Sequence, residues 1–290
     1  IRQAVSKLDE IDDKPLMMLG KIQSGKTRSF IGVISLAFDN GYDIPVKFTK
    51  HLNPISTRTI IFLNGAMKPN FDVYPLYHRH TWGSKFQMNS LNIYDASLNL
   101  SQDYLLAWYQ GVQANPLFLA IDNIINQLKN KLNLKNSELV FYGSSGGGWT
   151  ALKLAEHFPG SLAVAVNPQI SVLDYGIKTA VNKFLSVTYN DDNIDSIRDK
   201  YGSLLTINHD CFKQTNTEVS SQFLLVQNIQ DTHHYNDHFL KFWGNFVKDP
   251  KKTGWDDQSH NYTILYDHPS GHGVETVEVI EEIINQLNNM

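Results

Sequence analysis

The sequence contains only one cysteine, Cys211, among its 290 residues. A disulfide within the chain is therefore excluded. Scarce cysteine suits a reducing compartment, so we expect a cytoplasmic location. Cys211 lies in a polar segment that lacks the strand, turn and helix needed to present a nucleophile, and we interpret it as a structural thiol.

The sequence also lacks a strong charge excess and a long hydrophobic run. Its formal net charge of −4 gives no electrostatic basis for binding nucleic acid or an anionic membrane. No apolar run approaches the ~18 residues needed to span a bilayer. The longest such run, residues 30–38, has the length of a strand. With 42% hydrophobic and 19% charged residues, the composition is that of an ordinary folded protein.

Strand and helix patterns run through most of the chain, which is long enough for one large α/β domain or for two small ones. The clearest helix pattern spans residues 117–132, where apolar residues recur at three- and four-residue spacing. A second amphipathic pattern lies near the end, at residues 274–287. Strand patterns occupy residues 30–38, 44–48, 59–63, 91–94, 139–142, 161–166, 222–226 and 261–266.

A glycine-rich turn joins the strand pattern of residues 139–142 to a helix pattern that follows it. Residues 143–147 of this turn fit the pattern G-x-S-x-G. Strand, tight turn and helix together lift the hydroxyl of Ser145 off the sheet edge and direct the backbone N–H of Gly146 toward a developing oxyanion. Ser145 is therefore the candidate nucleophile and Gly146 a candidate oxyanion-hole donor. Taken alone, the pattern also fits a plain turn with a surface serine.

An acid and a histidine follow in the order that a serine triad needs. Asp231 comes just after the strand pattern of residues 222–226, and His272 lies between two glycines after the pattern of residues 261–266. A serine nucleophile needs a base, and the base needs an acid that orients it. We therefore predict a triad of Ser145, Asp231 and His272.

Other interpretations of these acids and histidines stay open. Asp237 is the second candidate for the triad acid, although it lies further along the following helix pattern, and Asp231 also suits the N-cap of that helix. His233, His234 and His238 suggest a metal cluster, because His234 and His238 share a helix face. No third ligand group is well spaced. We therefore predict no metal site and expect solvated or rim histidines.

These segments resemble the α/β-hydrolase superfamily, with the similarity covering residues 31–290. Within that range, Tyr-Gly-Ser-Ser-Gly-Gly-Gly at 142–148, Asn-Pro-Gln at 167–169 and Gly-His-Gly at 271–273 resemble bacterial serine esterases and O-acetyltransferases of capsule or surface glycans. The resemblance implies an α/β-hydrolase fold, with a mostly parallel central sheet and helices on both faces. It also implies an esterase or O-acetyltransferase that acts on a glycan or another small ester through an acyl-enzyme.

The resemblance carries further expectations about the site. In the superfamily, the loop after the strand at residues 59–63 donates the second oxyanion-hole N–H, which here would come from Gly65 or Ala66. An insertion corresponding to residues 170–220, whose helical patterns are mixed, is usually a cap over the active site. No metal or organic cofactor is implied, and acetyl-CoA is the candidate acyl donor of a transferase.

Aromatic and basic residues gather at positions 77–82, in a loop expected on the catalytic side of the sheet. His78, Arg79 and Trp82 are of types that stack on a sugar ring or pair with an acidic glycan. The same residue types suit ordinary packing and solvated charge. The sequence leaves these two interpretations open.

Residues 1–30 form an N-terminal extension of uncertain role. Residues 15–30 resemble a P-loop segment, and Gly25, Lys26 and Thr27 end its G-x-x-x-x-G-K-[ST] pattern. A working P-loop needs a helix directly after its lysine, whereas the next residues favour a β-hairpin. Because the pattern itself matches, an ATP-binding protein is an alternative function. A non-catalytic hydrolase-like module in glycan export or assembly is another.

Overall fold

The computed structural model describes residues 30–37, 42–51, 54, 56–67, 77–191 and 193–290. The predicted nucleotide-binding residues Gly25, Lys26 and Thr27 lie outside the described residues, as does the rest of residues 1–29. Residues 30–37 form a strand, in agreement with the sequence pattern.

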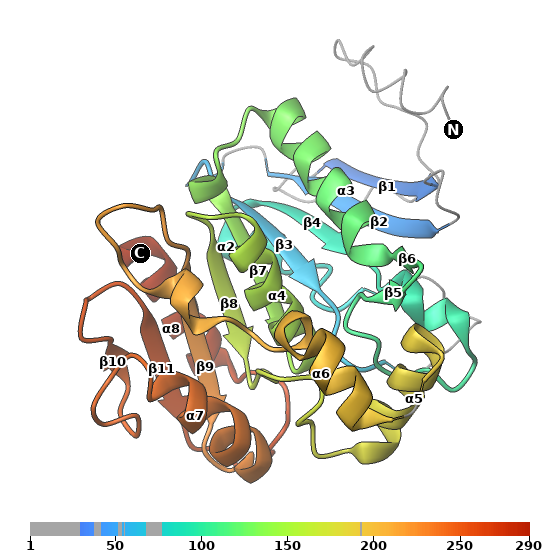
Figure 1. The fold of residues 1–290 in the computed structure, drawn as a ribbon. Coiled ribbons are helices and arrows are strands. Elements are labelled where there is room, and N and C mark those ends of the chain that lie inside the picture. The colour runs from blue at the N-terminus through green and yellow to red at the C-terminus, as the bar shows by residue number, and fades with distance from the viewer. Residues whose placement is uncertain (1–29, 38–41, 52–53, 55, 68–76, 192) are drawn as a thin grey trace.

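A nine-stranded sheet forms the centre of the structure, with the order β1-β2-β4-β3-β7-β8-β9-β11-β10 (Figure 1). The strands from β4 to β11 in this order run parallel to their neighbours, and β1, β2 and β10 pair antiparallel. The sheet is therefore mostly parallel, as predicted. Its strands are β1 Phe30–Ala37, β2 Asp43–Lys50, β3 Thr59–Leu63, β4 Asn89–Ile93, β7 Leu139–Ser144, β8 Leu162–Val166, β9 Gln222–Asn228, β10 Gly254–Trp255 and β11 Tyr262–Tyr266.

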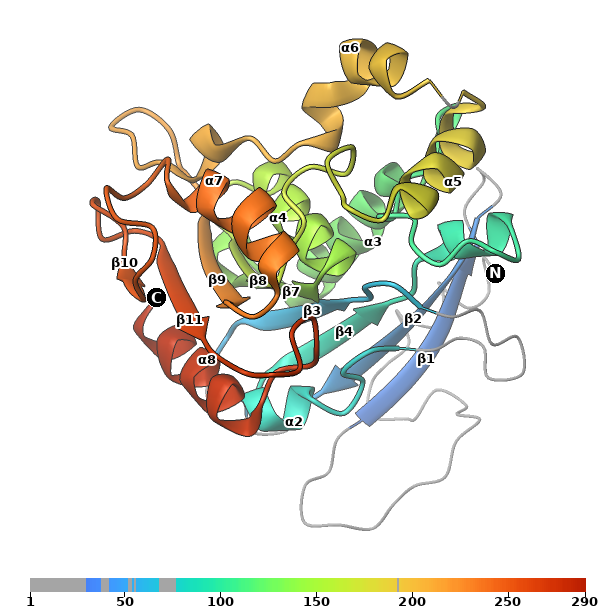
Figure 2. The ribbon, with the colours of Figure 1, turned by 90° about the horizontal axis from the view of Figure 1, so that it is seen from below.

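Helices cover both faces of the sheet (Figure 2). One face packs against α3, α4 and α7, and the other packs against α2 and α8. Because both faces are covered, the central strand β8 is apolar throughout, and all five of its residues are buried. The helices are α2 Gly83–Phe86, α3 Leu117–Leu132, α4 Gly146–His157, α5 Lys178–Tyr189, α6 Ile194–Leu205, α7 Leu240–Trp243 and α8 Val277–Asn289.

Short elements complete the described chain. A small two-stranded sheet pairs β5 Gly111–Val112 with β6 Asn115–Pro116. Three 3-10 turns and a π-helix are η2 Ala96–Leu100, η3 Asn136–Glu138, η4 His209–Phe212 and η5 His234–Phe239. None of the helices in the described ranges is long and apolar enough to cross a bilayer.

Residues 170–220, where the sequence suggests a cap, contain α5, α6 and η4 between β8 and β9. Phe184 of α5 is fully buried, and its ring centroid lies 5.0 Å from that of Trp108. This segment therefore packs onto the loop that carries Trp108. A cap over the active site stays a prediction.

Candidate active site

Ser145 lies in a strained turn between β7 and α4. Its backbone has φ 56° and ψ −124°, a conformation that costs a non-glycine residue about 1–3 kcal/mol. The turn is tight enough that a Cβ on Gly143 would lie 2.0 Å from the Gly147 carbonyl oxygen, and a Cβ on Gly147 would lie 2.7 Å from the Asn64 carbonyl oxygen. Only glycine fits at these two positions, so the G-x-S-x-G pattern is explained by packing.

The side chain of Gln169 contacts the Ser145 hydroxyl directly. Gln169 Nε2 donates to Ser145 Oγ at 2.9 Å, and Trp108 Nε1 donates to Gln169 Oε1 at 2.9 Å. An indole nitrogen only donates, so this second bond fixes which end of the amide faces the serine. Gln169 and Trp108 are fully buried and Ser145 is 6% exposed. This hydrogen bond is therefore shielded from water.

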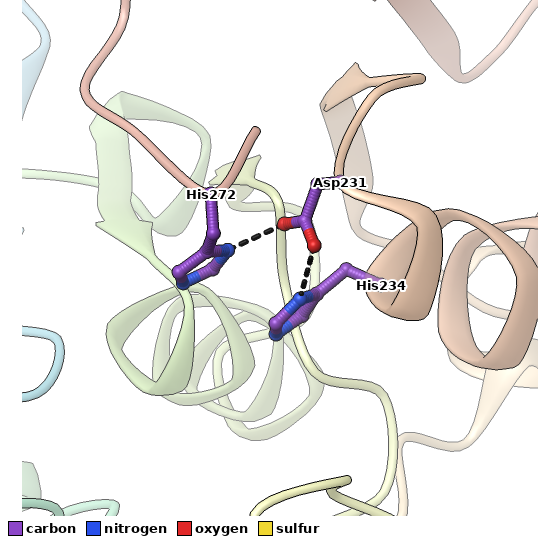
Figure 3. Close-up of side chains that lie close together, drawn as sticks. All are labelled: Asp231, His234 and His272. Carbon is purple, nitrogen blue, oxygen red and sulfur yellow. Dashed lines mark hydrogen bonds and ion pairs between the residues drawn. The ribbon is translucent and has the colours of Figure 1, made fainter. Parts of the chain in front are cut away.

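Asp231 holds two histidines, one on each carboxylate oxygen (Figure 3). His234 Nδ1 lies 2.9 Å from Oδ1, and His272 Nδ1 lies 2.5 Å from Oδ2. Burial raises the pKa of Asp231, but hydrogen bonds from the two histidines outweigh burial and hold the pKa well below its ordinary value. An ionised carboxylate only accepts, so both rings carry a hydrogen on Nδ1.

The two imidazole rings stack, yet their environments differ. Their centroids lie 4.2 Å apart with 12° between the planes. His234 is 4% exposed, and its Nε2 lies 3.2 Å from Gln169 Nε2. The His272 side chain is 41% exposed, and its Nε2 has no hydrogen bond to any described residue. Of the two rings, His272 therefore keeps the open nitrogen that a general base needs. No hydrogen bond joins it to Ser145 among the described residues.

Asn228, at the end of β9, fixes the loop that carries His272. Its Nδ2 donates to the carbonyl oxygens of His268 and Gly271, both at 2.8 Å. Its Oδ1 accepts from the backbone N–H groups of His268 and Gln230. Asn228 is fully buried. One side chain thus ties the His272 loop to the strand that leads to Asp231.

The loop after β3 lies against the Ser145 turn. A Cβ on Gly65 would lie 2.8 Å from the Ser144 carbonyl oxygen and 3.6 Å from Ser145 Cβ. Ala66 is exposed, and Gly146 is the first residue of α4. The N-terminus of that helix adds positive potential beside the serine. This arrangement is compatible with oxyanion-hole donation from Gly146 and from Gly65 or Ala66, which stays a prediction.

Two of the predicted substrate-binding residues are engaged in packing. Arg79 forms a buried pair with Glu275, and Tyr142 OH donates to the same carboxylate. The Arg79 guanidinium lies 5.3 Å from the centroid of the Trp82 ring, and Trp82 stacks on Phe86. These contacts match the packing interpretation.

His78, the third predicted substrate-binding residue, is half-buried. Burial, and then the charge of Arg79, lower its pKa to about 4. A role for these three residues in substrate binding stays a prediction.

The expectation of solvated or rim histidines in the segment after β9 is wrong for two of them. His234 and His238 are 4% and 1% exposed, because η5 turns its histidine rings into the protein. His238 Nδ1 accepts from the Ile170 backbone N–H at 3.2 Å. His233, in contrast, pairs with Asp237, which is exposed.

A possible metal set also differs from the one that the sequence suggests. Asp231, His234 and His272 each offer a ligand atom, and these atoms lie within 4.8 Å of one another. A carboxylate and two imidazoles suit a transition metal. In the structure, both histidine Nδ1 atoms are hydrogen-bonded to the Asp231 carboxylate, and the absence of a metal site stays a prediction.

Sequence reasoning missed Gln169, Trp108 and His234 as members of this site. Gln169 lies in the turn after β8, where a polar side chain in an otherwise buried segment was the available signal. The contact between Trp108 and Gln169 joins residues 61 positions apart, and that between Gln169 and His234 joins residues 65 positions apart. Only the folded chain reveals such contacts.

Neither a protein-family model nor a curated protein sequence matches the chain. Solved structures do match. A capsule O-acetyltransferase of Neisseria meningitidis serogroup A has a TM-score of 0.58 and 18% identity, over 89% of this chain and 94% of that one. A mutant of that enzyme is known in complex with CoA. A post-proline cleaving enzyme from Rickettsia typhi has a TM-score of 0.54 and 15% identity, over 84% of this chain and 34% of that one.

The Glycosylation Associate Protein complex from Streptococcus agalactiae also matches, with a TM-score of 0.58 and 12% identity. The match covers 90% of this chain and 46% of that one, so the chain spans about half the length of that Streptococcus protein. At these identities the comparisons carry the fold alone. The chain has an α/β-hydrolase-like fold, as the sequence resemblance implies, and its structural neighbours include enzymes.

Proposed function

We propose that this protein is a serine-dependent acyl-transfer enzyme that works through an acyl-enzyme. The observation that carries the proposal is the strained conformation of Ser145, at φ 56° and ψ −124°, between β7 and α4. Backbone strain of this kind persists where the surrounding structure enforces it, and it is concentrated at functional sites. The Asp231–His272 pair, which leaves His272 Nε2 open, supports the same assignment.

In the proposed reaction, His272 Nε2 removes the hydroxyl proton of Ser145 as Oγ attacks an acyl carbonyl carbon. Asp231 keeps the hydrogen of His272 on Nδ1 and stabilises the imidazolium that forms. The N–H of Gly146 and that of Gly65 or Ala66 bind the oxyanion. The tetrahedral intermediate then expels the leaving group, which takes the proton from His272, and the acyl group stays on Ser145.

The acyl-enzyme is resolved by water in an esterase or by a hydroxyl group of an acceptor in a transferase. In both cases His272 deprotonates the attacking hydroxyl and returns the proton to Ser145. We propose a sugar hydroxyl as the acceptor of a transferase reaction, with acetyl-CoA as its donor. The likeness to a capsule O-acetyltransferase over most of both chains supports this choice, although it is a likeness of fold.

The nucleophile is tested with p-nitrophenyl acetate and a fluorophosphonate probe. The neighbouring serine in the same turn supplies a matched control, so the wild type is compared with Ser145→Ala and Ser144→Ala. We expect turnover and labelling in the wild type and in Ser144→Ala, and neither in Ser145→Ala. A wild type that shows neither would overturn the proposal and favour a non-catalytic module on a hydrolase scaffold.

The acceptor is tested by partitioning of the acyl-enzyme. With acetyl-CoA as donor, release of CoA is followed with and without glycan fragments that carry free hydroxyl groups, and acetylated glycan is detected by mass spectrometry. A transferase forms acetylated glycan at the expense of free acetate. Release of acetate alone, at a rate that the glycans do not change, identifies an esterase.

A further inference from the structure

Asp231 is connected to Ser145 by a route that does not pass through His272. The route runs from Asp231 to His234, from His234 to Gln169, and from Gln169 to Ser145 Oγ. We propose that Gln169 is a further catalytic residue that holds Ser145 Oγ, and that His234 is a positioning residue that must be uncharged for Gln169 to do so. This inference rests on the proposed function, because it assigns roles around the same nucleophile.

The donors and acceptors along this route have a single consistent direction. The Trp108 indole donates to Gln169 Oε1 at 2.9 Å, so the amide NH₂ group faces the other way. That group lies 2.9 Å from Ser145 Oγ and 3.2 Å from His234 Nε2, and both atoms must accept. His234 Nε2 is therefore unprotonated. Its hydrogen is on Nδ1, where Asp231 accepts it at 2.9 Å.

The contact with Gln169 affects the serine in two ways. Because Oγ accepts a hydrogen from Gln169, the serine rotamer is fixed and the hydroxyl hydrogen stays available for a base. As that hydrogen leaves, the N–H of Gln169 supports the negative charge that develops on Oγ. Gln169 and Trp108 are fully buried, and His234 is 4% exposed. Water does not compete for these bonds, which are stronger for that reason.

Protonation of His234 breaks this arrangement. A hydrogen on Nε2 would face the NH₂ group of Gln169, donor against donor. Rotation of the amide gives no relief, because it places the NH₂ group against the Trp108 indole N–H, which cannot accept. The resting contact between Gln169 and Ser145 is therefore coupled to a neutral His234.

The titratable groups that face His234 come from three segments. Asp231, in the turn after β9, favours the charged ring, whereas His272, from the loop before α8, opposes it. His233, the residue before the π-helix, and His238, within it, lie with ring centroids 5.2 Å and 5.6 Å away. The Tyr175 ring, from the segment before α5, lies 5.8 Å away. Burial lowers the pKa of His234 and outweighs the hydrogen bond and charge of Asp231, which raise it. The charges of His272 and His233 lower this pKa further, in agreement with a neutral ring.

The test compares Gln169→Ala, His234→Ala and His234→Gln with the wild type in kcat, KM and rate of fluorophosphonate labelling across pH. The matched control is His233→Ala, the adjacent histidine that contacts neither Ser145 nor Gln169. Loss of a partner that orients a reactive group typically costs about 10- to 100-fold in activity. We expect a loss of this size in kcat for Gln169→Ala and His234→Ala, with KM little changed.

His234→Gln separates positioning from a merely structural role. A glutamine amide can donate to Asp231 and accept from Gln169, but it does not titrate. We expect this variant to recover most of the kcat that His234→Ala loses. We also expect kcat/KM of this variant to fall at acidic pH with the uptake of one proton. In the wild type the fall becomes steeper and depends on two protons, because His234 also titrates.

Three results separate this inference from the proposed function. Full activity in Gln169→Ala and His234→Ala overturns the inference and leaves the proposed function intact. A loss in His234→Ala that His234→Gln does not recover, or identical acidic limbs in His234→Gln and the wild type, also overturns it. A wild type without turnover or labelling overturns both. Thermal unfolding of each variant checks its fold, and Gln169→Ala tests the inference even where His234→Ala does not fold.

Discussion

The same two segments of the chain build two polar clusters with opposite properties. Tyr142 and Ser145 lie three residues apart at the end of β7, and His272 and Glu275 lie three residues apart before α8. In the first cluster, Glu275 accepts from Tyr142 OH at 2.9 Å and from Arg79 Nη2 at 2.7 and 2.9 Å. We call this set of three residues the closed cluster. The second, open cluster consists of Ser145, Gln169, Asp231, His234 and His272.

The two clusters contain similar chemistry, with a carboxylate, cationic or imidazole partners and a hydroxyl. They differ in what they leave available. The side chains of Arg79 and Glu275 are 8% and 1% exposed and face each other. In the open cluster, Ser145 is strained and the His272 side chain is 41% exposed. A carboxylate whose partners all face inward stabilises the fold. A carboxylate that orients a histidine with a free ring nitrogen can take part in catalysis.

Asp231→Asn tests the open cluster most severely. An asparagine has one acceptor oxygen for the two imidazole Nδ1–H groups that Asp231 binds, and its NH₂ group cannot accept from the other ring. It also has no charge to stabilise the imidazolium that His272 forms. A comparable change in a serine protease lowers kcat about 10⁴-fold with the geometry intact. We expect a loss of that order in ester hydrolysis, together with a folded protein by circular dichroism. Activity within tenfold of the wild type would remove Asp231 from the triad.

Glu275→Ala tests the closed cluster, for which we expect a loss of stability. It leaves the Arg79 guanidinium buried without its anion, and removal of one partner of a buried pair costs about 3–5 kcal/mol. We expect a loss of that order in the free energy of unfolding, measured by urea denaturation. The double variant Arg79→Met/Glu275→Leu removes both charges and should recover much of the loss. Wild-type stability in Glu275→Ala would contradict a structural role for this cluster.

Asn228→Ala tests how far the open cluster depends on its loop. The change removes two hydrogen bonds to the carbonyl oxygens of His268 and Gly271 and so loosens the backbone next to His272. Loss of such an orienting partner should lower kcat about 10- to 100-fold. Gln230→Ala, which removes an exposed contact to Asp267 in the same loop, is the control and should leave kcat unchanged. Equal rates in both variants would show that the loop holds its shape without Asn228.

Local patterns explain why the fold and part of the site could be predicted. The strand β8 is a continuous apolar run, β3 and β9 each contain four consecutive apolar residues, and the turn at Ser145 requires glycines at fixed spacing. These signals are contained in a few adjacent residues. The closed cluster has no such signal, because Arg79 and Glu275 are 196 positions apart. A basic residue in an aromatic segment is therefore as compatible with substrate binding as with packing.

The histidines after β9 show the same limit on a smaller scale. Spacing places His234 and His238 on one helix face, but it does not indicate whether that face is buried. The structure has a π-helix at His234–Phe239. Its histidines face the segment after β8, where Gln169 and Ile170 bind them. These partners lie more than 60 positions away in the sequence, beyond the reach of any local pattern.

The smallest expected effect concerns His238, the buried histidine beside the open cluster. Burial, followed by the charges of His234 and His233, lowers its pKa from an ordinary 6.5 to about 3. Between these two pH values the His238 ring is protonated in the unfolded chain and neutral in the native protein. The free energy of unfolding therefore falls as the pH falls from about 6.5 to about 3. At pH 5 the loss from this residue is about 2 kcal/mol or less.

His238→Gln removes the titrating ring and keeps an oxygen that can accept from the Ile170 N–H. We expect its free energy of unfolding, measured by urea denaturation at pH 7 and pH 5, to change less with pH than that of the wild type. The other histidines are the same in both proteins, so the difference between the two slopes isolates His238. Equal slopes would mean that His238 takes up its proton in the folded protein. Folding would then not prevent protonation of His238, although its Nδ1 accepts a hydrogen bond from the Ile170 N–H.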